Sequence, residues 1–252
     1  TGVQTCALPI CIEVETDVLA AKAQYAMAGY LMQRRAGRPH VTLKMALSKD
    51  ARIGLRSAGQ VKITGPESNA MVHVMRARSD LILIGIGTAL EDDPSLTCRL
   101  PGLEDRSPTR LVLDRHLRLP LDSALVRSAR DIPLIIATTQ MPDNEAYRRL
   151  ASAGCMMMAC EEDDTGIALP ELLDDLANRG FSAILVEGGA AIARSFINAA
   201  LVDRIALYQG PCEIGENGID APLNPDEMPK GFVLHSTRIY GKDLCREYER
   251  TC

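Results

Sequence analysis

The sequence has 252 residues, with no tryptophan and only three phenylalanines. Single-stranded nucleic acids usually bind on platforms of aromatic side chains, so the sequence does not favour a binding surface of that kind. It contains 28 Lys and Arg against 33 Asp and Glu, a net charge of −5, and has no block of basic residues. We therefore expect neither nucleic acid nor an anionic membrane as a partner.

The chain also has no uninterrupted apolar run long enough to span a membrane as a helix. It has eight cysteines, but no C-x-x-C pair occurs and its four histidines are isolated from one another. Zinc sites and thiol redox motifs usually need closer spacing, so we expect no metal site. The cysteines are best interpreted as reduced, mostly buried thiols of a cytoplasmic protein.

The first ten residues do not continue the pattern that follows them, and they begin without Met. Residues 1–10 are too short for a signal peptide and have no basic end. We interpret them as a non-native segment derived from a sequencing adapter and leave them out of the fold prediction. The natural gene is expected to extend further upstream.

Hydrophobic patterning predicts alternating strands and helices. An amphipathic helix is expected over 16–35, starting near Thr16 and Asp17 and ending before Gly37. Strands are predicted over 41–47, 81–84, 110–113, 133–137 and 182–187, and helices over 64–78, 142–152 (opened by Pro142), 170–178 and 190–200. Three strands without intervening helices follow, over 202–208, about 231–240 and 244–248. This order predicts one α/β domain over 39–252, whose mostly parallel sheet has helices on both faces and an antiparallel C-terminal element.

The strongest local signal lies where a buried strand ends in Glu187 and two glycines, Gly188 and Gly189, precede a helix. Glycines allow the backbone to approach a ligand closely, and the free N–H groups of a helix start suit a pyrophosphate. Ligands of open α/β sheets bind at the carboxyl ends of the strands. The alternative is an ordinary strand-to-helix turn that uses glycine for its backbone conformation.

A second candidate turn begins with Gly85 and Gly87 and continues through Thr88 and Asp92. The third glycine of the dinucleotide-binding fingerprint is missing, and Pro94 excludes a long helix, so this is not a standard Rossmann turn. Thr88 and Asp92 could bond a ribose or a phosphate. Alternatively, they cap a short helical turn, which is the commoner use of these residue types.

Three cationic residues remain open to two interpretations. Lys44 lies in the middle of a predicted strand, where it either lies at a sheet edge or snorkels to the surface, or else points into a ligand cleft. Arg76 lies near a helix end and Arg99 in a loop, where each alone would be a surface residue. Only a common pocket would make the two arginines a phosphate clamp.

Taken in order, these motifs resemble the reductase domain of the bifunctional riboflavin biosynthesis deaminase–reductase family. The resemblance covers about residues 39–250, and residues 12–38 resemble the segment that joins the reductase to its deaminase domain. The motifs are Val41-Thr42-Leu43-Lys44, Ser48-x-Asp50-x-Arg52-Ile53, Ile63-Thr64-Gly65, Val72-His73-x-x-Arg76-Ala77, Gly85-x-Gly87-Thr88, Asp92-Asp93-Pro94-x-Leu96-Thr97-x-Arg99 and Val186-Glu187-Gly188-Gly189.

The resemblance implies a dihydrofolate-reductase-like fold and NADPH-dependent reduction of 5-amino-6-(5-phosphoribosylamino)uracil to the ribitylamino compound. It implies substrate contacts at Lys44, Gln60, Arg76, Leu96, Arg99 and Glu187. It implies cofactor contacts at Ala46, Lys62, Thr88, Asp92, Arg115, Gly189, Ala190, Ala191, Ile192, Ala193, Arg194 and Ser195. Gln60, Lys62 and Arg115 depart from the residues that the family usually has at these positions.

Hydride transfer to C1′ of an opened ribosylamine needs no nucleophile, metal or catalytic triad, because the nicotinamide carries the reactivity. Lys44 could polarise or orient the ribose, and Glu187 could hold a hydroxyl or a ring N–H. We expect Arg76 and Arg99 to bind the 5′-phosphate, and Arg115 to select NADPH through its 2′-phosphate.

Zinc deaminases need H-x-E and P-C-x-x-C, and neither motif occurs here, so we expect no deaminase activity from this chain. A deaminase domain is expected upstream in the natural protein, and the family resemblance suggests a homodimer. The sequence leaves two alternative functions open. One is a reductase of the same fold that acts on a pterin such as dihydrofolate, and the other is a non-catalytic nucleotide-binding scaffold.

Overall fold

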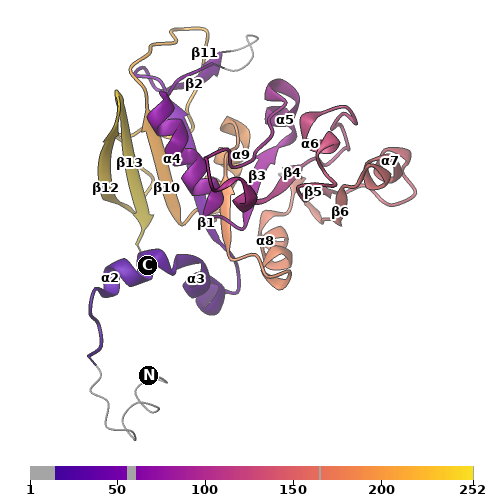
Figure 1. Cartoon of the computed structure of the whole chain (residues 1–252), viewed down its shortest axis with the longest axis horizontal. Coiled ribbons are helices and arrows are strands. Elements are labelled where there is room, and N and C mark those ends of the chain that lie inside the picture. Colours follow the sequence, from indigo (N-terminus) through magenta and orange to yellow (C-terminus); the bar gives the residue numbers. More distant parts are fainter. Residues whose placement is uncertain (1–14, 56–60, 165, 252) are drawn as a thin grey trace, which may run out of the picture.

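The computed structural model describes residues 15–55, 61–164 and 166–251. At its centre is a nine-stranded sheet (Figure 1). Its strands are β1 (His40–Leu47), β3 (Leu81–Gly85), β4 (Thr109–Leu113), β5 (Leu134–Thr138), β6 (Met156–Ala159), β9 (Ala183–Val186), β10 (Arg204–Gln209), β12 (Phe232–Tyr240) and β13 (Asp243–Arg250). They lie in the order β12-β13-β10-β1-β9-β3-β4-β5-β6.

The sheet is parallel from β10 to β6 and antiparallel at its other edge. β1 pairs with both β10 and β9, and β9, β3, β4, β5 and β6 continue the parallel pairing. β13 runs antiparallel to β10 and to β12. The mostly parallel sheet with an antiparallel C-terminal element is thus confirmed. The strand β6, which was not predicted, adds one further parallel strand beside β5.

Helices cover both faces of the sheet, as the sequence predicted (Figure 1). They are α4 (Pro66–Ala77), α5 (Ile86–Asp92), α6 (Ala124–Arg127), α7 (Glu145–Ala153), α8 (Leu169–Asn178) and α9 (Ala190–Asn198). On one face, Leu43 of β1 packs in a core that includes Leu176 of α8 and Phe196 of α9. On the other face, Ile84 of β3 belongs to a second core with α6 and α7, and α4 covers β10 through Val72.

Strand burial follows from these layers. All five residues of β3 are buried, as expected for a short apolar run that is covered on both faces. In β1, the buried residues alternate with half-buried ones from Leu43 onward, so that Lys44 and Ala46 face away from the α8 and α9 core.

Several short elements had no prediction. A two-stranded sheet joins β2 (Arg52–Leu55) to β11 (Gly218–Asp220), and a second joins β7 (Glu162–Asp163) to β8 (Gly166–Ile167). A 3-10 turn, η2, spans Glu104–Arg106. The short helix α5 also lies where only a turn was expected.

The helix expected over 16–35 is wrong in its start and in its continuity. It begins at Ala20, because Asp17 and Leu19 have positive φ angles of 64° and 54° that no helix accepts. It then divides at Met27 into α2 (Ala20–Ala26) and α3 (Ala28–Ala36). The break lies near Gly29, where an added Cβ would stand 2.8 Å from the Ser182 carbonyl oxygen. The N-terminal helices therefore pack closely against the segment that contains Ser182.

The helix expected from Pro142 begins later, at Glu145. Asn144 is its N-cap and accepts hydrogen bonds from the backbone N–H groups of Ala146 and Tyr147. The side-chain cap, rather than the proline, therefore fixes the start of α7.

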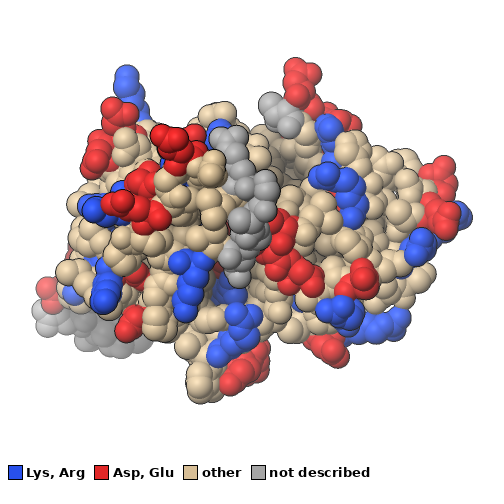
Figure 2. All heavy atoms as spheres, turned by 90° about the horizontal axis from the view of Figure 1, so that it is seen from above, with Lys and Arg blue, Asp and Glu red and all other residues tan. Residues whose placement is uncertain are grey.

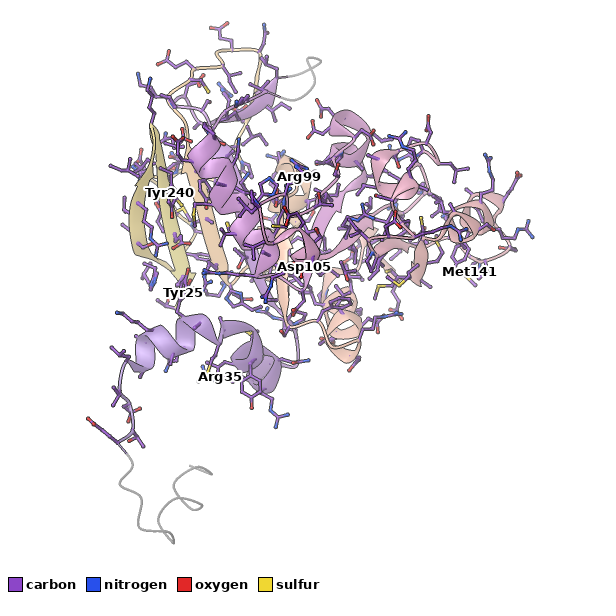
Figure 3. The ribbon with its side chains drawn as sticks, in the orientation of Figure 1. Tyr25, Arg35, Arg99, Asp105, Met141 and Tyr240 are labelled. Atoms are coloured by element: carbon purple, nitrogen blue, oxygen red, sulfur yellow. The ribbon has the colours of Figure 1, made fainter. Side chains whose placement is uncertain are left out.

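Tyr25 attaches the N-terminal helices to the antiparallel edge of the sheet (Figure 3). Its ring stacks on His235 of β12, with centroids 4.7 Å apart. The guanidinium of Arg204, from β10, lies 3.7 Å from the centroid of the same ring. No helix in the described part of the chain is long and apolar enough to cross a membrane.

Candidate active site

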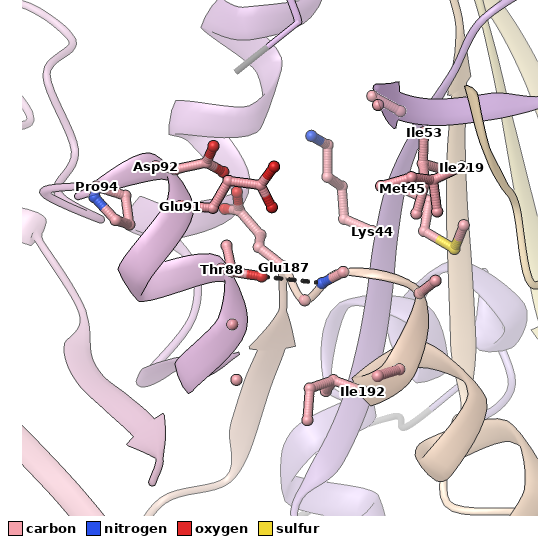
Figure 4. A pocket seen from close by; sticks show the side chains of 18 of the residues that line it. Lys44, Met45, Ile53, Thr88, Glu91, Asp92, Pro94, Glu187, Ile192 and Ile219 are labelled. Atoms are coloured by element: carbon pink, nitrogen blue, oxygen red, sulfur yellow. Dashed lines mark hydrogen bonds between the residues drawn. The ribbon is translucent and has the colours of Figure 1, made fainter. Parts of the chain in front are cut away.

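A cavity of about 810 Å³ opens at the carboxyl ends of β1, β3 and β9 (Figure 4). Many of the side chains singled out in the sequence line it, although they come from distant segments. These residues are Lys44, Ala46, Lys62, Arg76, Thr88, Asp92, Leu96, Glu187, Gly189, Ala190, Ala191, Ile192 and Arg194. Lys44 therefore lies on a central strand and lines the cavity, and it is not at a sheet edge.

Strand register explains why Lys44 and Glu187 lie together. The last residue of β9, Val186, pairs with Leu43 of β1 and with Leu83 of β3. Lys44 is therefore the first residue of β1 beyond the end of β9, and Glu187 is the first residue after β9. Both side chains emerge at the same edge of the sheet, where ligands of open α/β sheets bind.

Glu187 forms a two-point ion pair with Arg76 of α4. The Nε and Nη2 groups of Arg76 each donate to one Glu187 oxygen, at 2.8 Å. Nη1 of Arg76 donates to the Thr97 carbonyl oxygen at 3.1 Å, which attaches the loop after α5 to the same guanidinium. The exposed fractions of the two side chains are only 12% for Arg76 and 10% for Glu187.

The surroundings shift the pKa values of these groups. Burial raises the pKa of Glu187, but the hydrogen bonds and charge of Arg76 and the charge of Lys44 bring the net value below the ordinary one. Burial is also the largest influence on Lys44 and lowers its pKa, while Glu187 raises it and Arg76 lowers it further. Glu187 is therefore ionised near neutral pH, and Lys44 gives up its proton more readily than an exposed lysine does.

The ion pair restricts what Arg76 can offer to a ligand. Removing one partner of a buried ion pair costs about 3–5 kcal/mol, whereas one hydrogen bond to a charged group contributes about 1.5–3 kcal/mol. A bound anion therefore does not take the guanidinium away from Glu187. Arginine has five N–H donors, so two N–H bonds of Arg76 remain for a ligand while the other three keep their protein partners.

The turn from β9 to α9 has the features of a phosphate cradle. Gly189 is the N-cap of α9, and the first turn of the helix has neither a side-chain cap nor an acidic residue. The nine-residue helix thus directs uncompensated N–H groups and the positive end of its dipole at the cavity. Thr88 accepts a hydrogen bond from the Gly189 backbone N–H at 3.2 Å (Figure 4, dashed line), which joins α5 to this turn.

Ile192 explains two of the glycines. A Cβ on Gly188 would stand 2.7 Å from the Ile192 Cβ, and one on Gly85 would stand 2.6 Å from the Ile192 Cγ1. Neither glycine has a positive φ. These glycines are therefore needed for the close approach of three segments rather than for an unusual backbone conformation.

The loop after α5 forms another wall of the cavity and is strained. Asp93 and Leu96 have positive φ angles of 39° and 55°, a region that non-glycine residues rarely adopt. Leu96 is buried and lines the cavity. Beside it, burial and the neighbouring charge of Glu91 raise the pKa of Asp92.

Four of the candidate residues do not line this cavity in the structure. The Arg99 side chain is exposed, and its backbone N–H donates to His73 Nδ1 at 3.2 Å (Figure 3). Arg115 and Ser195 line a neighbouring cavity of about 230 Å³, which shares Ile192 and Arg118 with the main one. Ala193 is fully buried in the core, and Gln60 lies outside the described residues.

Sequence reasoning missed several residues of the cavity. Ile53 of β2 and Ile219 of β11 line one side, and their two-stranded sheet joins segments that no sequence pattern connected. Arg118 lies three residues after Arg115 and lines both cavities, so the basic character of this stretch was a usable signal. His73, in the Val72-His73 motif, does not line the cavity, and its Nδ1 accepts a hydrogen bond from the Arg99 backbone N–H.

Comparison with known proteins identifies the relatives of this chain. Residues 39–245 match the family model described as the RibD C-terminal domain. The chain is 35% identical over 204 residues to riboflavin biosynthesis protein RibD of Bacillus amyloliquefaciens, which covers 81% of this chain and 54% of that protein. It is 33% identical over 193 residues to the 2,5-diamino-6-ribosylamino-4(3H)-pyrimidinone 5′-phosphate reductase of Archaeoglobus fulgidus, which covers 73% of this chain and 85% of that protein.

A solved structure of Acinetobacter baumannii RibD aligns with a TM-score of 0.80 at 26% identity, covering 96% of this chain and 66% of that one. The dihydrofolate-reductase-like α/β fold expected from the sequence is thereby confirmed. The chain spans between 54% and 65% of the length of four RibD relatives.

The packing at Ile192 generates a prediction. Gly188→Ala should lower the free energy of unfolding by about 1–3 kcal/mol, because its Cβ overlaps the partly buried Ile192 side chain at the turn. Gly87→Ala is the matched control, since an added Cβ there meets nothing within 4 Å. Urea denaturation of both variants measures the difference in the free energy of unfolding. The double variant Gly188→Ala with Ile192→Ala should lose less stability than the sum of the losses in the two single variants. Equal stability of Gly188→Ala and the unmodified protein would contradict the close approach.

Proposed function

Because this chain belongs to the RibD C-terminal domain family, we propose that it reduces 5-amino-6-(5-phosphoribosylamino)uracil to 5-amino-6-(5-phosphoribitylamino)uracil in riboflavin biosynthesis, with NADPH as the cofactor. The observation that supports this proposal is that Lys44, Arg76 and Glu187 line the same cavity as the start of α9. A site for a phosphorylated sugar and a dinucleotide needs cationic and hydrogen-bonding groups beside a pyrophosphate cradle. A non-catalytic scaffold would have no use for a half-buried lysine in that position.

The residues present fit a nicotinamide dinucleotide. The uncapped start of α9 would hold the pyrophosphate, and Thr88 and Asp92 of α5 would hold a ribose. When bound, NADPH supplies the hydride that the protein itself cannot provide. The protein must hold the substrate against the cofactor and exclude water from the cavity.

Lys44 and Glu187 are proposed to act on the ribosyl group of the substrate. The opened ribosylamine has an imine carbon, C1′, that accepts a hydride, and the adjacent nitrogen must then receive a proton. The Lys44 ammonium, in a buried position that lowers its pKa, is proposed to orient the ribosyl group and assist this protonation. Glu187 stays ionised and accepts a hydrogen bond from a substrate hydroxyl or ring N–H.

NADPH oxidation by the purified chain, with and without the phosphoribosylaminouracil, tests this function. We expect oxidation only with that substrate, and at least a hundred-fold lower kcat for Lys44→Met, since general acid catalysis contributes about 10²–10⁴-fold. Two other substrates separate the alternatives: dihydrofolate, and the diaminopyrimidinone phosphate that the archaeal relative's name gives. Faster turnover of either one would replace the proposed substrate, and no turnover of any would contradict a reductase.

Arg115 is proposed to select NADPH over NADH. It lines the smaller cavity with His116 and Arg118, where a 2′-phosphate would meet several cationic or hydrogen-bonding groups. Arg115→Ala should weaken NADPH binding roughly ten- to a hundred-fold, from the loss of about 1.5–3 kcal/mol of charge-assisted hydrogen bonding. NADH binding should barely change. Titration of both cofactors by calorimetry measures the difference.

Glu162 provides the control for this prediction. Its carboxylate pairs with Arg115 at 2.6 Å, but both side chains are well exposed, so the ion pair stabilises little and competes with a phosphate. Glu162→Gln should therefore tighten NADPH binding slightly and leave NADH binding unchanged. Equal affinity of the unmodified protein for the two cofactors would show that Arg115 has no such role.

Arg76 and Arg99 are both proposed to contact the substrate, but they differ in what else they hold. Arg99 does not line the cavity, but its exposed side chain is proposed to reach the 5′-phosphate, whereas Arg76 lines the cavity and has only the N–H bonds that Glu187 and Thr97 leave free. Arg99→Ala should raise KM for the phosphorylated substrate about ten- to a hundred-fold and leave the dephosphorylated substrate unaffected. Arg76→Ala should impair the use of both substrates.

Steady-state kinetics with the two substrates measures these effects, and Arg106→Ala, an exposed arginine in the same loop, is the matched control. Equal harm to both substrates from Arg99→Ala would show that Arg99 supports the loop and does not bind phosphate.

We propose that the protein is a homodimer, as the family resemblance suggested. β12 is an edge strand whose Val233, Leu234 and Ile239 have exposed fractions of 52%, 55% and 75%. Exposed apolar edge strands are templates for pairing with another chain, which supports this proposal.

Basic and acidic side chains are interspersed on the face of the molecule in Figure 2. The upstream deaminase domain and the cytoplasmic location remain predictions.

A further inference from the structure

Lys44, Arg76 and Glu187 form an unequal arrangement of charges. Both carboxylate oxygens of Glu187 accept hydrogen bonds from Arg76, at 2.8 Å each. None of the ion pairs within residues 15–55, 61–164 and 166–251 includes Lys44. We propose that Arg76 is a positioning residue that holds Glu187 away from Lys44, so that the Lys44 ammonium stays unpaired and available to the substrate.

The geometry of Arg76 supports this role. Its guanidinium is fixed at three points, by the two oxygens of Glu187 and by the Thr97 carbonyl oxygen at 3.1 Å. A bidentate guanidinium fixes the plane of a carboxylate, which a single point charge does not. Glu187 therefore cannot rotate toward Lys44 without losing hydrogen bonds in a mostly buried site.

Apart from Arg76, Lys44 is the cation that acts most strongly on Glu187. The two residues lie beside each other at the ends of neighbouring strands, where Lys44 follows Leu43, the partner of Val186. Two opposite charges in a mostly enclosed site attract each other more strongly than they would in water, so they would pair directly. An ammonium held by a carboxylate would then have to be released before it could bind the substrate.

The charged and titratable groups around Lys44 define the expected titration. Glu187 of the β9 turn raises its pKa and Arg76 of α4 lowers it, after burial has already lowered it. From β10, the Tyr208 ring faces the ammonium, with its centroid 6.0 Å from Nζ. Across the cavity, α5 contributes Glu91 and Asp92.

The sign of the change in Arg76→Gln follows from these groups. The variant removes a positive charge near Lys44 and frees the Glu187 carboxylate to pair with it. Both effects favour the protonated form of Lys44, so the pKa of Lys44 rises. If the protonated amine acts in the reaction, the alkaline limb of kcat/KM moves to higher pH by the same amount.

The test is an NMR titration of the full chain with ¹³C-labelled lysine, in which Lys44→Met assigns the Lys44 signal. Arg76→Gln should raise the pKa of Lys44 by one unit or more, a tenfold shift in the proton concentration at its midpoint. Arg76→Lys, which keeps the charge without the bidentate fork, should give a smaller rise. Adding Glu187→Gln to Arg76→Gln should reverse the rise, because no carboxylate remains to pair with Lys44.

Arg118→Gln is the matched control, since Arg118 lines the same cavity but makes no ion pair in the described residues, and it should leave the titration unchanged. An unchanged or lowered pKa in folded Arg76→Gln would overturn the proposal. Should that variant fail to fold, Arg76→Lys decides, and no rise in it would overturn the proposal as well.

This inference rests on the proposed function only for the use that the substrate makes of Lys44. The titration needs neither substrate nor turnover, so a reductase assay that fails while the shift appears would overturn the function and not the charge arrangement. A normal assay without any shift would do the reverse.

Discussion

The ion pair between Arg76 and Glu187 is the interaction on which the site depends. It joins α4 to the end of β9, and through the Thr97 carbonyl oxygen it also holds the loop after α5. Because the two side chains are mostly buried, Arg76 without Glu187 would be left as an unpaired charge, at a cost of about 3–5 kcal/mol. These three segments are therefore kept in one arrangement by electrostatics as well as by packing.

The sheet provides the positions that this ion pair uses. β9 lies between β1 and β3 and ends before β1 does, so the edge of the sheet has a step at Val186. Lys44 extends over that step from β1, and the glycine turn from β9 to α9 fills the space beside it. A shift of one residue in the pairing of β1 would turn Lys44 toward the apolar core of α8 and α9, so the register of a buried strand decides where the charge lies.

Much of this could be predicted from the sequence, for identifiable reasons. Buried parallel strands such as Leu81–Gly85 appear in the sequence as apolar runs, and Gly188 and Gly189 mark a turn into a helix. These two signals predicted correctly that a cavity lies at the carboxyl ends of the strands. The pairing of Arg76 with Glu187 could not be predicted, because 111 residues separate them and nothing local connects the two. The small sheet of β2 and β11 has the same difficulty, since its two short strands lie far apart in the sequence.

The loop from Asp93 to Leu96 shows how a cavity wall can oppose local backbone preference. Each of these two residues is held at a positive φ, which costs of order 1–3 kcal/mol for a non-glycine residue. The surroundings offset this cost: Asp93 accepts a hydrogen bond from the Ala124 backbone N–H at 2.7 Å, and Leu96 is buried in the core with Ile84. Because Thr97 follows at once and binds Arg76, the strained loop and the ion pair support each other. The shape of the cavity is therefore fixed by long-range contacts that override the conformations these residues would adopt alone.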